Sequence, residues 1–520
     1  MPASRPFSLH DGRLADGDSA SASSSGASPA SSAAPEPTPA GAGADADSRA
    51  GSPPVIVLGG GLLGAVLALR LRAAGHEVEL VEAGEAIGGL AGTMAIGGTT
   101  WDRFYHVVLL SDLNTRQLLT ELGLDDRLRW GTTRTGFFTD GAMHSMSNAI
   151  EFLRFPALGL LDKLRLGGTI FLASRIRRPE PLERQLATDW LGRYSGKRVL
   201  EKIWLPLLRS KLGANAQHAS AAFIWAIIAR LYAARRSGLK EERFGYIEGG
   251  YEGVNRALAE RLSKAGVRLR FGTEVAAIEP ASQAAPARLV VRLRNGDALD
   301  ASGVVSTLAP PRMAPLVPAL PEAERARMAN IPYQGIVCAA MLLRKPLSGF
   351  YVTNITDADI PFTGVIEMTA LVDRERFGGH SLVYLPLYLA QDAREWHLDD
   401  GQVRERFVAA IRRMHPAFDP TDIIEFKVSR ARQVLAISTL DYSNTWMPPV
   451  ATSLPGLHCV NAAQIPYGTL NVNETLGLVE RHLPALLRDL SQASAEPAGA
   501  TGAATQTTHT NPANPATPAS

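Results

Sequence analysis

The chain has 520 residues, and its 53 Lys and Arg side chains nearly balance its 51 Asp and Glu side chains, for a formal charge of +2. Apolar residues make up 46% and charged residues 20%, the composition of an ordinary soluble globular protein with more than one domain. The near-neutral charge argues against nucleic acid as a partner, and the two cysteines, Cys338 and Cys459, exclude a disulfide framework or a multi-thiolate metal site. We predict no metal site and, because no run of about 18 apolar residues occurs, no membrane-spanning helix.

Both ends of the chain have the composition of disordered tails. In residues 1–50, Ala, Ser, Pro and Gly account for 35 of the 50 positions, and residues 491–520 contain no Leu, Ile, Val, Phe, Tyr or Trp. Such segments cannot bury enough apolar surface to offset the loss of chain entropy. The first segment also lacks the apolar stretch of a secretory signal peptide, so we predict a cytoplasmic protein with two disordered tails.

The first folded segment combines a strand, a glycine-rich turn and a helix. The apolar run 55–58 predicts a buried parallel strand, and residues 59–64 read G-G-G-L-L-G, a G-x-G-x-x-G motif. A helix is predicted over 65–74 and a second strand over 77–81, directly before Glu82. An acid at this point is placed to accept hydrogen bonds from ribose hydroxyls, and the whole order is typical of a dinucleotide-binding Rossmann unit.

Each glycine of the motif has a physical role in holding a dinucleotide. Gly59 allows the tight turn, Gly61 lets the pyrophosphate approach the backbone, and Gly64 lets the helix pack closely on the strand. The N–H groups at the start of the helix, at Leu62 and Leu63, offer positive partial charge to the phosphates. We therefore predict that these residues bind the cofactor.

The segment after Glu82 favours a flavin over a nicotinamide cofactor. It continues through Ala83 to a glycine pair, Gly88-Gly89, where a nicotinamide dehydrogenase would normally begin another helix. The pair resembles the extended motif of flavoproteins with two dinucleotide-binding domains. The chain resembles the FAD-dependent amine oxidase, protoporphyrinogen oxidase and phytoene desaturase superfamily, which borders the UDP-galactopyranose mutases. The resemblance implies that this loop passes the flavin's phosphates, with Leu90 where many of these oxidases carry a basic residue.

The resemblance implies an α/β fold with two parts and disordered termini. One part is a Rossmann-like FAD-binding domain with a parallel sheet, which we predict from residues 51–135, 244–311 and 426–490. The other is an α+β substrate domain built from two insertions. We predict a helical, basic part at 136–243 and an antiparallel-sheet part at 312–425, which lies over the flavin.

Other segments match the family's cofactor-binding units. A helix over 254–265 leads towards a strand at Val275, whose backbone contacts adenine in the family. The strand near 456–462 resembles one that family members end with Gly-Asp; because Ala462 replaces the Asp, we predict that Asn461 or nearby backbone groups contact the ribityl chain. The segment 469–473 is expected to line the flavin, with Thr469, Leu470 and Asn471 as contacts. We expect the FAD to be held non-covalently.

The helical insertion carries a strong local charge. Residues 151–240 contain 17 Lys and Arg against 6 Asp and Glu, a local excess of +11 in a chain of net +2. Three interpretations stay open: a peripheral contact with anionic lipid at the inner face of the membrane, a channel for an anionic substrate, or a solvated basic face.

The resemblance assigns the chemistry mainly to the cofactor, since flavin N5 accepts a hydride while the protein orients the donor carbon. Tyr105 and His106 follow the glycine-pair loop closely enough to reach the flavin, and Tyr467 lies in the C-terminal motif; these are the predicted catalytic residues. Amine oxidases carry a lysine in the strand that corresponds to 333–343, and this segment contains none. That difference favours dehydrogenation of a carbon–carbon or carbon–heteroatom bond over amine oxidation.

These patterns predict an enzyme. It is an FAD-dependent oxidoreductase, similar to the protoporphyrinogen oxidases and desaturases, that dehydrogenates a bulky, partly apolar small molecule by hydride transfer to flavin N5. Two alternatives stay open. One is a flavoenzyme similar to UDP-galactopyranose mutase, without net redox change, and the other is a catalytically inert flavin-binding protein.

Overall fold

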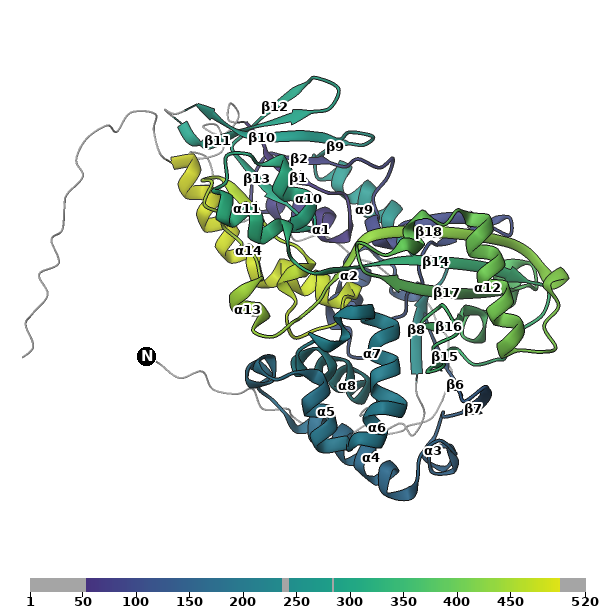
Figure 1. Ribbon diagram of the computed structural model, residues 1–520. Coiled ribbons are helices and arrows are strands. Elements are labelled where there is room, and N and C mark those ends of the chain that lie inside the picture. The colour runs from purple at the N-terminus through teal and green to yellow at the C-terminus, as the bar shows by residue number, and fades with distance from the viewer. Residues whose placement is uncertain (1–52, 236–242, 283–284, 496–520) are drawn as a thin grey trace, which may run out of the picture. The chain divides into compact units, whose positions relative to one another are not determined.

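The computed structural model describes residues 53–235, 243–282 and 285–495 (Figure 1). The tail predicted at 1–50 and most of the tail predicted at 491–520 lie outside these residues. The last helix, α14 (Val472–Ala495), continues past residue 490, where we placed the start of the second tail. The extension reads Ser-Gln-Ala-Ser-Ala, without Gly or Pro, and each residue added to an existing helix costs little.

A five-stranded parallel sheet confirms the predicted Rossmann-like fold. β1 pairs in register with β2 on one side and with β13 on the other, and all of its residues are buried. Because both faces of the sheet are covered, the central strands are short continuous apolar runs. The strands in sheet order are β19 (Leu457–Cys459), β13 (Gly303–Ser306), β1 (Val55–Leu58), β2 (Val78–Val81) and β9 (Arg268–Arg270).

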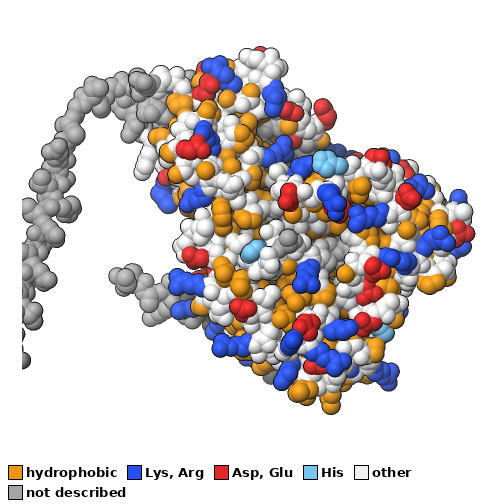
Figure 2. Space-filling view, in the orientation of Figure 1, with side chains coloured by type: hydrophobic (Ala, Val, Ile, Leu, Met, Phe, Trp, Pro, Cys, Tyr) orange, Lys and Arg blue, Asp and Glu red, His pale blue; other side chains and the backbone are white. Residues whose placement is uncertain are grey.

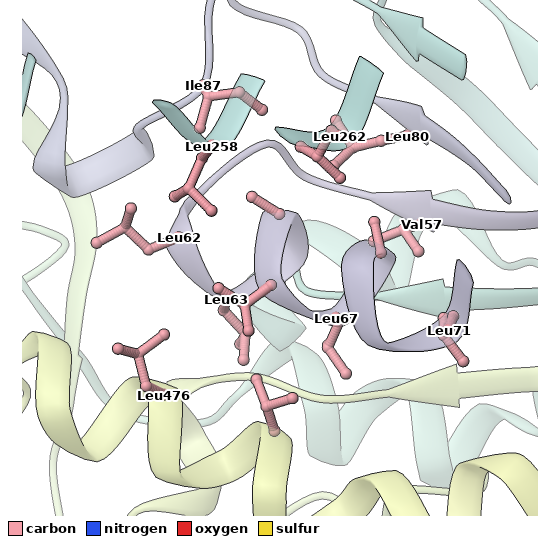
Figure 3. Packing of buried hydrophobic residues seen from close by; sticks show 14 of the residues in the cluster. Val57, Leu62, Leu63, Leu67, Leu71, Leu80, Ile87, Leu258, Leu262 and Leu476 are labelled. Carbon is pink, nitrogen blue, oxygen red and sulfur yellow. The ribbon is translucent and has the colours of Figure 1, made fainter. Parts of the chain in front are cut away.

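One core joins three helices to this sheet (Figure 3). Leu67 and Leu71 of the first helix are fully buried, as are Leu258 and Leu262 of the second. Figure 3 shows Leu476 of the third helix in the same cluster. The helices are α1 (Leu62–Ala73), α9 (Glu252–Lys264) and α14.

A second core lies between the parallel sheet and a three-stranded antiparallel sheet. Ile56 and Leu58 of β1 pack there with Leu289 and Val291, whereas Val57 belongs to the helical core. This alternation is the period of two that a strand imposes on its side chains. The covering elements are β10 (Val275–Ser282), β11 (Ala285–Leu293), β12 (Ala298–Ala301), α10 (Pro310–Met313) and α11 (Glu322–Ala329).

A separate sheet of seven strands is built around β14 (Tyr333–Leu343), which is buried along its whole length. Alternate residues of β14 serve two cores. Val337 and Ala339 pack on the side that includes Phe407 of α12 (Asp400–Met414), and Cys338 packs on the opposite side. In sheet order the strands are β18 (Ile423–Ala436), β14, β17 (Ser381–Leu389), β16 (Gly364–Glu367), β15 (Val352–Ile355), β6 (Thr135–Thr139) and β7 (Ala142–Ser145).

This sheet crosses two of the domain limits that we drew from the sequence. β18 runs through residue 426, where we placed the return to the FAD-binding domain, and pairs with β14 as far as Ala436. The hairpin of β6 and β7 opens the insertion at 136–243, and β6 pairs in parallel with β15. Both segments join the sheet because a strand edge satisfies backbone groups that a loop would leave to solvent.

The segment between residues 149 and 235 is helical, as predicted, and has a core of its own. Trp190 and Trp204 are both buried in this core. A short π-helix (Leu200–Trp204) continues into α7, which packs against β17. The longer helices are α3 (Ala149–Arg154), α4 (Leu160–Arg175), α5 (Ala187–Ser195), α7 (Leu205–Leu212) and α8 (Ala221–Arg235).

Candidate active site

The glycine turn between β1 and α1 leaves no room for side chains at two positions. Gly59 has φ +104°, a left-handed conformation that favours glycine, and a Cβ there would lie 2.5 Å from Thr307 Oγ1. A Cβ at Gly64 would lie 1.9 Å from the carbonyl oxygen of Gly59. At Gly61, in contrast, a Cβ would meet nothing within 4 Å. The backbone at Gly61 is therefore open to an approaching group, as the phosphate role requires.

The helix α1 begins at Leu62, three residues earlier than predicted, directly from the turn. The side chains of Leu62 and Leu63 are buried in the core of the parallel sheet. Only their backbone N–H groups are thus left for a ligand, and the first N–H groups of a helix have no intrahelical partner. These N–H donors and the positive end of the α1 dipole lie together beside Gly61. This arrangement suits the negative charge of a pyrophosphate.

Glu82 follows β2 and closes the turn from the neighbouring strand. Its carboxylate accepts hydrogen bonds from the N–H groups of Gly60, at 2.5 Å, and Gly84, at 2.7 Å. Its backbone carbonyl accepts a hydrogen bond from Thr273 N–H at 3.0 Å. Ala83, the next residue, is exposed. The acid is therefore held at the rim of the turn, where ribose hydroxyls would meet it.

The predicted glycine pair lies directly against this turn. Gly88 forms an isolated parallel bridge with Gly61, and its N–H donates to the carbonyl of Gly60 at 2.9 Å. Gly88 and Gly89 have φ of +145° and +57°, and a Cβ at Gly89 would lie 3.1 Å from Gly61 Cα. Leu90 packs against the core on the side of β14 that includes Cys338, which we call the inner face. The loop thus joins the cofactor turn to the substrate sheet.

Two polar residues that the sequence did not suggest hold this loop. The Arg103 guanidinium donates to the carbonyl of Gly89 at 2.9 Å. The buried Asn255 of α9 donates from Nδ2 to the carbonyl of Ala91 at 2.9 Å. Arg103 brings a positive charge to the glycine pair from a point 14 residues along the chain, although Leu90 occupies the usual basic position. Arg103 directly follows the antiparallel hairpin of β3 (Thr93–Ile96) and β4 (Thr99–Asp102), and a basic residue at that point after a glycine pair could have served as a signal.

The segment before Val275 reaches the same edge of the parallel sheet. Gly272 N–H donates to the carbonyl of Gly84 at 2.9 Å, and Thr273 bonds to Glu82 as described. Val275 then begins β10. Its backbone is near the acid that we expect to bind the ribose, as an adenine contact would require.

Asn461 is buried, and its side chain is occupied within its own loop. Its Oδ1 accepts from Ala463 N–H at 2.9 Å, and its Nδ2 donates to Cys459 Sγ at 2.8 Å. These bonds fix the first turn of the short helix Ala462–Gln464. Any contact of this residue with a ribityl chain is left to its backbone. Burial raises the pKa of the Cys459 thiol to about 12, which makes it a poor nucleophile and agrees with non-covalent FAD.

Residues 469–473 form the entry to α14. Asn471 accepts from Glu474 N–H at 3.0 Å, as an N-cap, and donates to the carbonyl of Thr469 at 2.7 Å. Leu470 packs on the helical core of residues 149–235. Asn473 accepts from Asn114 N–H at 2.9 Å, which fixes α2 (Leu113–Glu121) to the same point. The predicted flavin-lining segment is therefore a rigid helix start.

His106 lies beside a buried acid. Its Nδ1 is 3.5 Å from Asp102 Oδ2, and its ring centroid is 4.9 Å from that of Tyr251. Asp102 also accepts from Tyr251 N–H at 2.7 Å. Burial, together with the charge of Asp102, raises the pKa of the Tyr251 phenol. The carboxylate therefore fixes the backbone at Tyr251 and adds to the effect of burial that keeps its phenol neutral, whereas His106 Nδ1 has no hydrogen-bond partner among the described residues.

Tyr105, Tyr388 and Lys211 form a second cluster. The hydroxyls of Tyr105 and Tyr388 are 3.1 Å apart, and Lys211 Nζ lies 5.7 Å from the centre of the Tyr388 ring. Burial raises the pKa of both phenols and lowers that of Lys211, with the charge of Arg230 adding to the latter effect. Within the described part of the chain, no carboxylate forms an ion pair with Lys211. The sequence placed no lysine in β14, but α7 brings one to its neighbour β17.

Tyr467 is bonded elsewhere. Its hydroxyl donates to Glu183 at 2.9 Å and lies 3.4 Å from Ser443 Oγ. Its ring packs on the helical core of residues 149–235. Tyr105 and His106, which are adjacent in the chain, thus lie near each other. The hydroxyl of Tyr467 instead links its segment to Glu183. The open backbone at Gly61 and the first N–H groups of α1 fit the pyrophosphate of a dinucleotide such as FAD.

Comparison with known proteins agrees with this geometry. Residues 64–462 match the family of flavin containing amine oxidoreductases. A protein from Exiguobacterium sp. 255-15, provisionally described as a protoporphyrinogen oxidase, superposes with a TM-score of 0.67 at 17% identity, over 85% of this chain and 99% of its own. Reduced UDP-galactopyranose mutase gives 0.64 at 14% identity, over 85% and 96%, and putrescine oxidase with bound putrescine 0.62 at 15%, over 84% and 99%. These likenesses concern the fold.

One relative has a higher sequence identity, but the match covers a shorter segment. The flavin-dependent L-tryptophan oxidase RebO of Lentzea aerocolonigenes is 32% identical over 120 residues, which span 22% of this chain and 25% of the relative. Fold and cofactor turn together place the chain among the FAD-dependent oxidoreductases. Because the family match covers most of its length, the chain belongs to the flavin-containing amine oxidoreductase family.

Proposed function

We propose that the enzyme dehydrogenates a bulky, partly apolar small molecule bound between the glycine-pair loop and the inner face of β14 and β17. The observation that carries the proposal is the apolar and aromatic core shared by Leu90, Tyr105 and Tyr388. This core joins the loop beside the cofactor turn to the sheet of the substrate domain. A substrate in contact with it would be recognised mainly through apolar and aromatic surface.

Within this proposal the chain positions the cofactor and the substrate. The N–H groups of α1 and the backbone at Gly61 hold the pyrophosphate, and Glu82 holds the ribose. Bound FAD supplies a two-electron acceptor for the substrate's hydride. Burial keeps the phenols of Tyr105 and Tyr388 protonated; one hydroxyl donates to the other, and the remaining hydroxyl proton orients the substrate as a hydrogen-bond donor.

Two further groups handle charge. His106 Nδ1 lies 3.5 Å from Asp102 Oδ2 without a hydrogen bond between them, and the other ring nitrogen, Nε2, accepts a proton from the substrate. Lys211, which has no ion-pair partner among the described residues, binds an anionic or strongly polar end of the substrate. The proposed substrate therefore has a bulky apolar body and one acidic end.

The test begins with the purified FAD-loaded protein under anaerobic conditions. It is mixed with protoporphyrinogen IX, phytoene, L-tryptophan and putrescine in turn, and the visible absorbance of oxidised flavin is followed. Bleaching by protoporphyrinogen IX is expected, because it combines a bulky apolar body with carboxylates; phytoene, which has no acidic end, tests whether that end is required, and L-tryptophan tests an amino-acid alternative. Bleaching by putrescine alone would contradict the proposal, because putrescine has neither an apolar body nor an acidic end.

The two alternatives give different results in the same apparatus. A mutase would leave the oxidised flavin unchanged and would convert UDP-galactopyranose only after reduction of the flavin with dithionite. An inert flavin-binding protein would bind FAD, respond to no compound and convert nothing. Bleaching identifies a dehydrogenase and conversion only after reduction identifies a mutase, so these two results exclude each other, and either one excludes the inert protein.

A further inference from the structure

The surface of α3 and α4 is unusually apolar. Ten large apolar side chains are exposed among the described residues, and six of these lie between residues 150 and 171. Their exposed fractions range from 53% for Phe171 to 68% for Leu160. A concentration of this kind on a short segment usually marks an interaction surface. The six side chains are Ile150, Leu153, Leu160, Leu161, Leu164 and Phe171.

The helix α4 is apolar on two opposite faces. Leu166 and Ala173 are buried where α4 packs against α5 and α8. Leu160, Leu164 and Phe171, at intervals of four and seven residues, share the opposite face, which is exposed. The buried face is enough to hold the helix on the protein. The outer apolar face therefore requires another explanation than the fold.

The two helices form one fixed surface. Lys163, although basic, is turned inward, and its Nζ donates to the carbonyl of Leu153 at the end of α3, at 2.7 Å. Asp162, the acid of α4, accepts a hydrogen bond from Gly159 N–H at 3.3 Å and forms an ion pair with Arg198 at 3.5 Å. The negative charge of Asp162 is therefore paired and does not oppose the approach of an anionic partner to the outer face.

Positive charge surrounds the apolar face. Arg154, Arg175, Arg177 and Arg178 are all exposed. The Arg175 guanidinium lies 4.8 Å from the centre of the exposed Phe171 ring. Figure 2 shows hydrophobic and basic side chains adjoining one another at the lower end of the view, where Figure 1 labels α3 and α4. Apolar side chains flanked by arginines are the pattern of a helix that lies at a membrane surface.

We propose that α3 and α4 form a docking surface for an anionic lipid bilayer. The leucines and Phe171 enter the boundary between headgroups and acyl chains, and the arginines contact the lipid phosphates. Among the described residues no helix is both long and apolar enough to cross a membrane, and a surface contact needs none. This inference goes beyond the proposed reaction and does not depend on the identity of the substrate.

Charge favours a bilayer over other occupants. A second copy of the chain would bring the same arginines against each other, and such like-charge contacts are unfavourable. A membrane with anionic lipid instead offers negative charge and an apolar layer at the same depth. The exposed leucines fit the apolar layer of such a membrane, and the arginines fit its negative charge.

The experiment is co-sedimentation of the full FAD-loaded chain with lipid vesicles. Vesicles of phosphatidylcholine alone are compared with vesicles of mixed phosphatidylcholine and phosphatidylglycerol. The wild type is expected to sediment with the mixed vesicles and to bind the neutral ones at least about tenfold more weakly. Absence of binding to the mixed vesicles would overturn the proposal.

Two variants separate the apolar contribution from the charge. In L164Q/F171Q the apolar face is interrupted, and binding to mixed vesicles is expected to fall at least about tenfold. I424Q/L440Q is the matched control, since these residues are 38% and 41% exposed but lie outside α3 and α4, and it should bind as the wild type does. Equal binding by L164Q/F171Q and the wild type would contradict the proposal.

A third variant, R175Q/R177Q/R178Q, is expected to lose most of the preference for mixed vesicles over neutral ones. Every variant is checked for FAD content and thermal unfolding midpoint, so that a folding defect is recognised. Sedimentation of the wild type and L164Q/F171Q without lipid tests for self-association; a dimer lost in the variant would assign the face to a second copy and overturn the proposal. Failure of vesicle binding would leave the flavin reduction experiments unaffected.

Discussion

The cofactor turn and the substrate cluster are built in different ways. At the turn, Glu82 and Gly60 are 22 residues apart, and the Glu82 carboxylate accepts a hydrogen bond from the backbone N–H of Gly60. In the substrate cluster, Tyr105 and Tyr388 are 283 residues apart and meet through side-chain hydroxyls. The first arrangement is fixed by one strand–turn–helix unit. The second depends on three separate elements that only the complete fold brings together.

This difference separates the two kinds of damage that a substitution can do. A change at the turn acts on the backbone, which has no spare volume at Gly59 and Gly64 and open space at Gly61, and it affects folding or FAD binding. A change in the substrate cluster removes a polar group from a packed scaffold and should leave FAD binding intact. The following predictions test that separation, from the largest effect to the smallest.

Gly64→Ala is expected to have the largest effect. Its Cβ would lie 1.9 Å from the carbonyl oxygen of Gly59, so α1 or the turn must move. Overpacking of this kind costs about 1–3 kcal/mol of the free energy of unfolding or more. The variant should purify with little FAD, measured as the flavin-to-protein absorbance ratio, and with a lower unfolding midpoint.

Gly61→Ala is the matched comparison. A Cβ at Gly61 meets nothing within 4 Å, so the apo protein should unfold at the same temperature as the wild type. FAD affinity should still fall by about tenfold or more, because the new methyl group enters the space of the phosphates. If Gly61→Ala kept full FAD affinity, the assignment of this turn to the pyrophosphate would be wrong.

Glu82→Gln tests the other wall of the cofactor site. The amide keeps one acceptor oxygen but loses the charge, and hydrogen bonds to charged groups contribute about 1.5–3 kcal/mol each. FAD affinity, measured by quenching of flavin fluorescence on binding, should therefore fall by about 10- to 100-fold. Glu85→Gln removes an exposed acid of the same loop and should have no effect.

The parallel sheet was predictable because its signals are local. The run at β1, the turn and Glu82 follow one another within 28 residues of sequence, and the observed β1 has the predicted limits. β18 was not placed in the substrate sheet from the sequence. Most of this strand is only partly buried, so its residues alternate without a strong apolar pattern. Its place is set by pairing with β14, a contact between segments about 90 residues apart.

The site shows the same limit. The tight glycine turn and the place of Glu82 beside it could be predicted from spacing, because they belong to one strand–turn–helix unit. Arg103 holds the glycine-pair loop from the end of a hairpin, its one local signal, and Asn255 holds it from α9, 164 residues along the chain, without any local signature. Asn461 was predicted as a ribityl contact from its place after β19, and its side chain bonds within its own loop. Side-chain hydrogen bonds between distant elements were the part that the sequence could not provide.

Lys211→Met tests the substrate cluster with a simple probe. 2-Naphthoate is titrated into the FAD-loaded protein, and binding is followed by the change in flavin absorbance. Loss of the cation should weaken 2-naphthoate binding by about tenfold, the range of one charged hydrogen bond. FAD content should not change. The neutral analogue 2-naphthylmethanol should bind the variant and the wild type alike, and Lys197→Met, at an exposed lysine of the same helical segment, should do nothing.

The pH dependence of the same titration gives a second measurement. Burial lowers the pKa of Lys211, so its positive charge is lost at a lower pH than that of an ordinary lysine. The protonated form binds the carboxylate; affinity of the wild type for 2-naphthoate should therefore decline as pH rises through this lowered pKa. In Lys211→Met the decline should be absent. A decline that persists in the variant would assign it to another group.

The smallest effect is expected for the tyrosine pair. Tyr105→Phe and Tyr388→Phe each remove one hydroxyl and leave the other without its partner at 3.1 Å. The double variant removes both, so a double-mutant cycle on the free energy of unfolding should give a coupling of about 1 kcal/mol. Tyr388→Phe retains the ring beneath Lys211, and the affinity for 2-naphthoate should stay near that of the wild type. A large loss of 2-naphthoate binding in this variant would show that the Tyr388 hydroxyl, and not Lys211, holds the carboxylate.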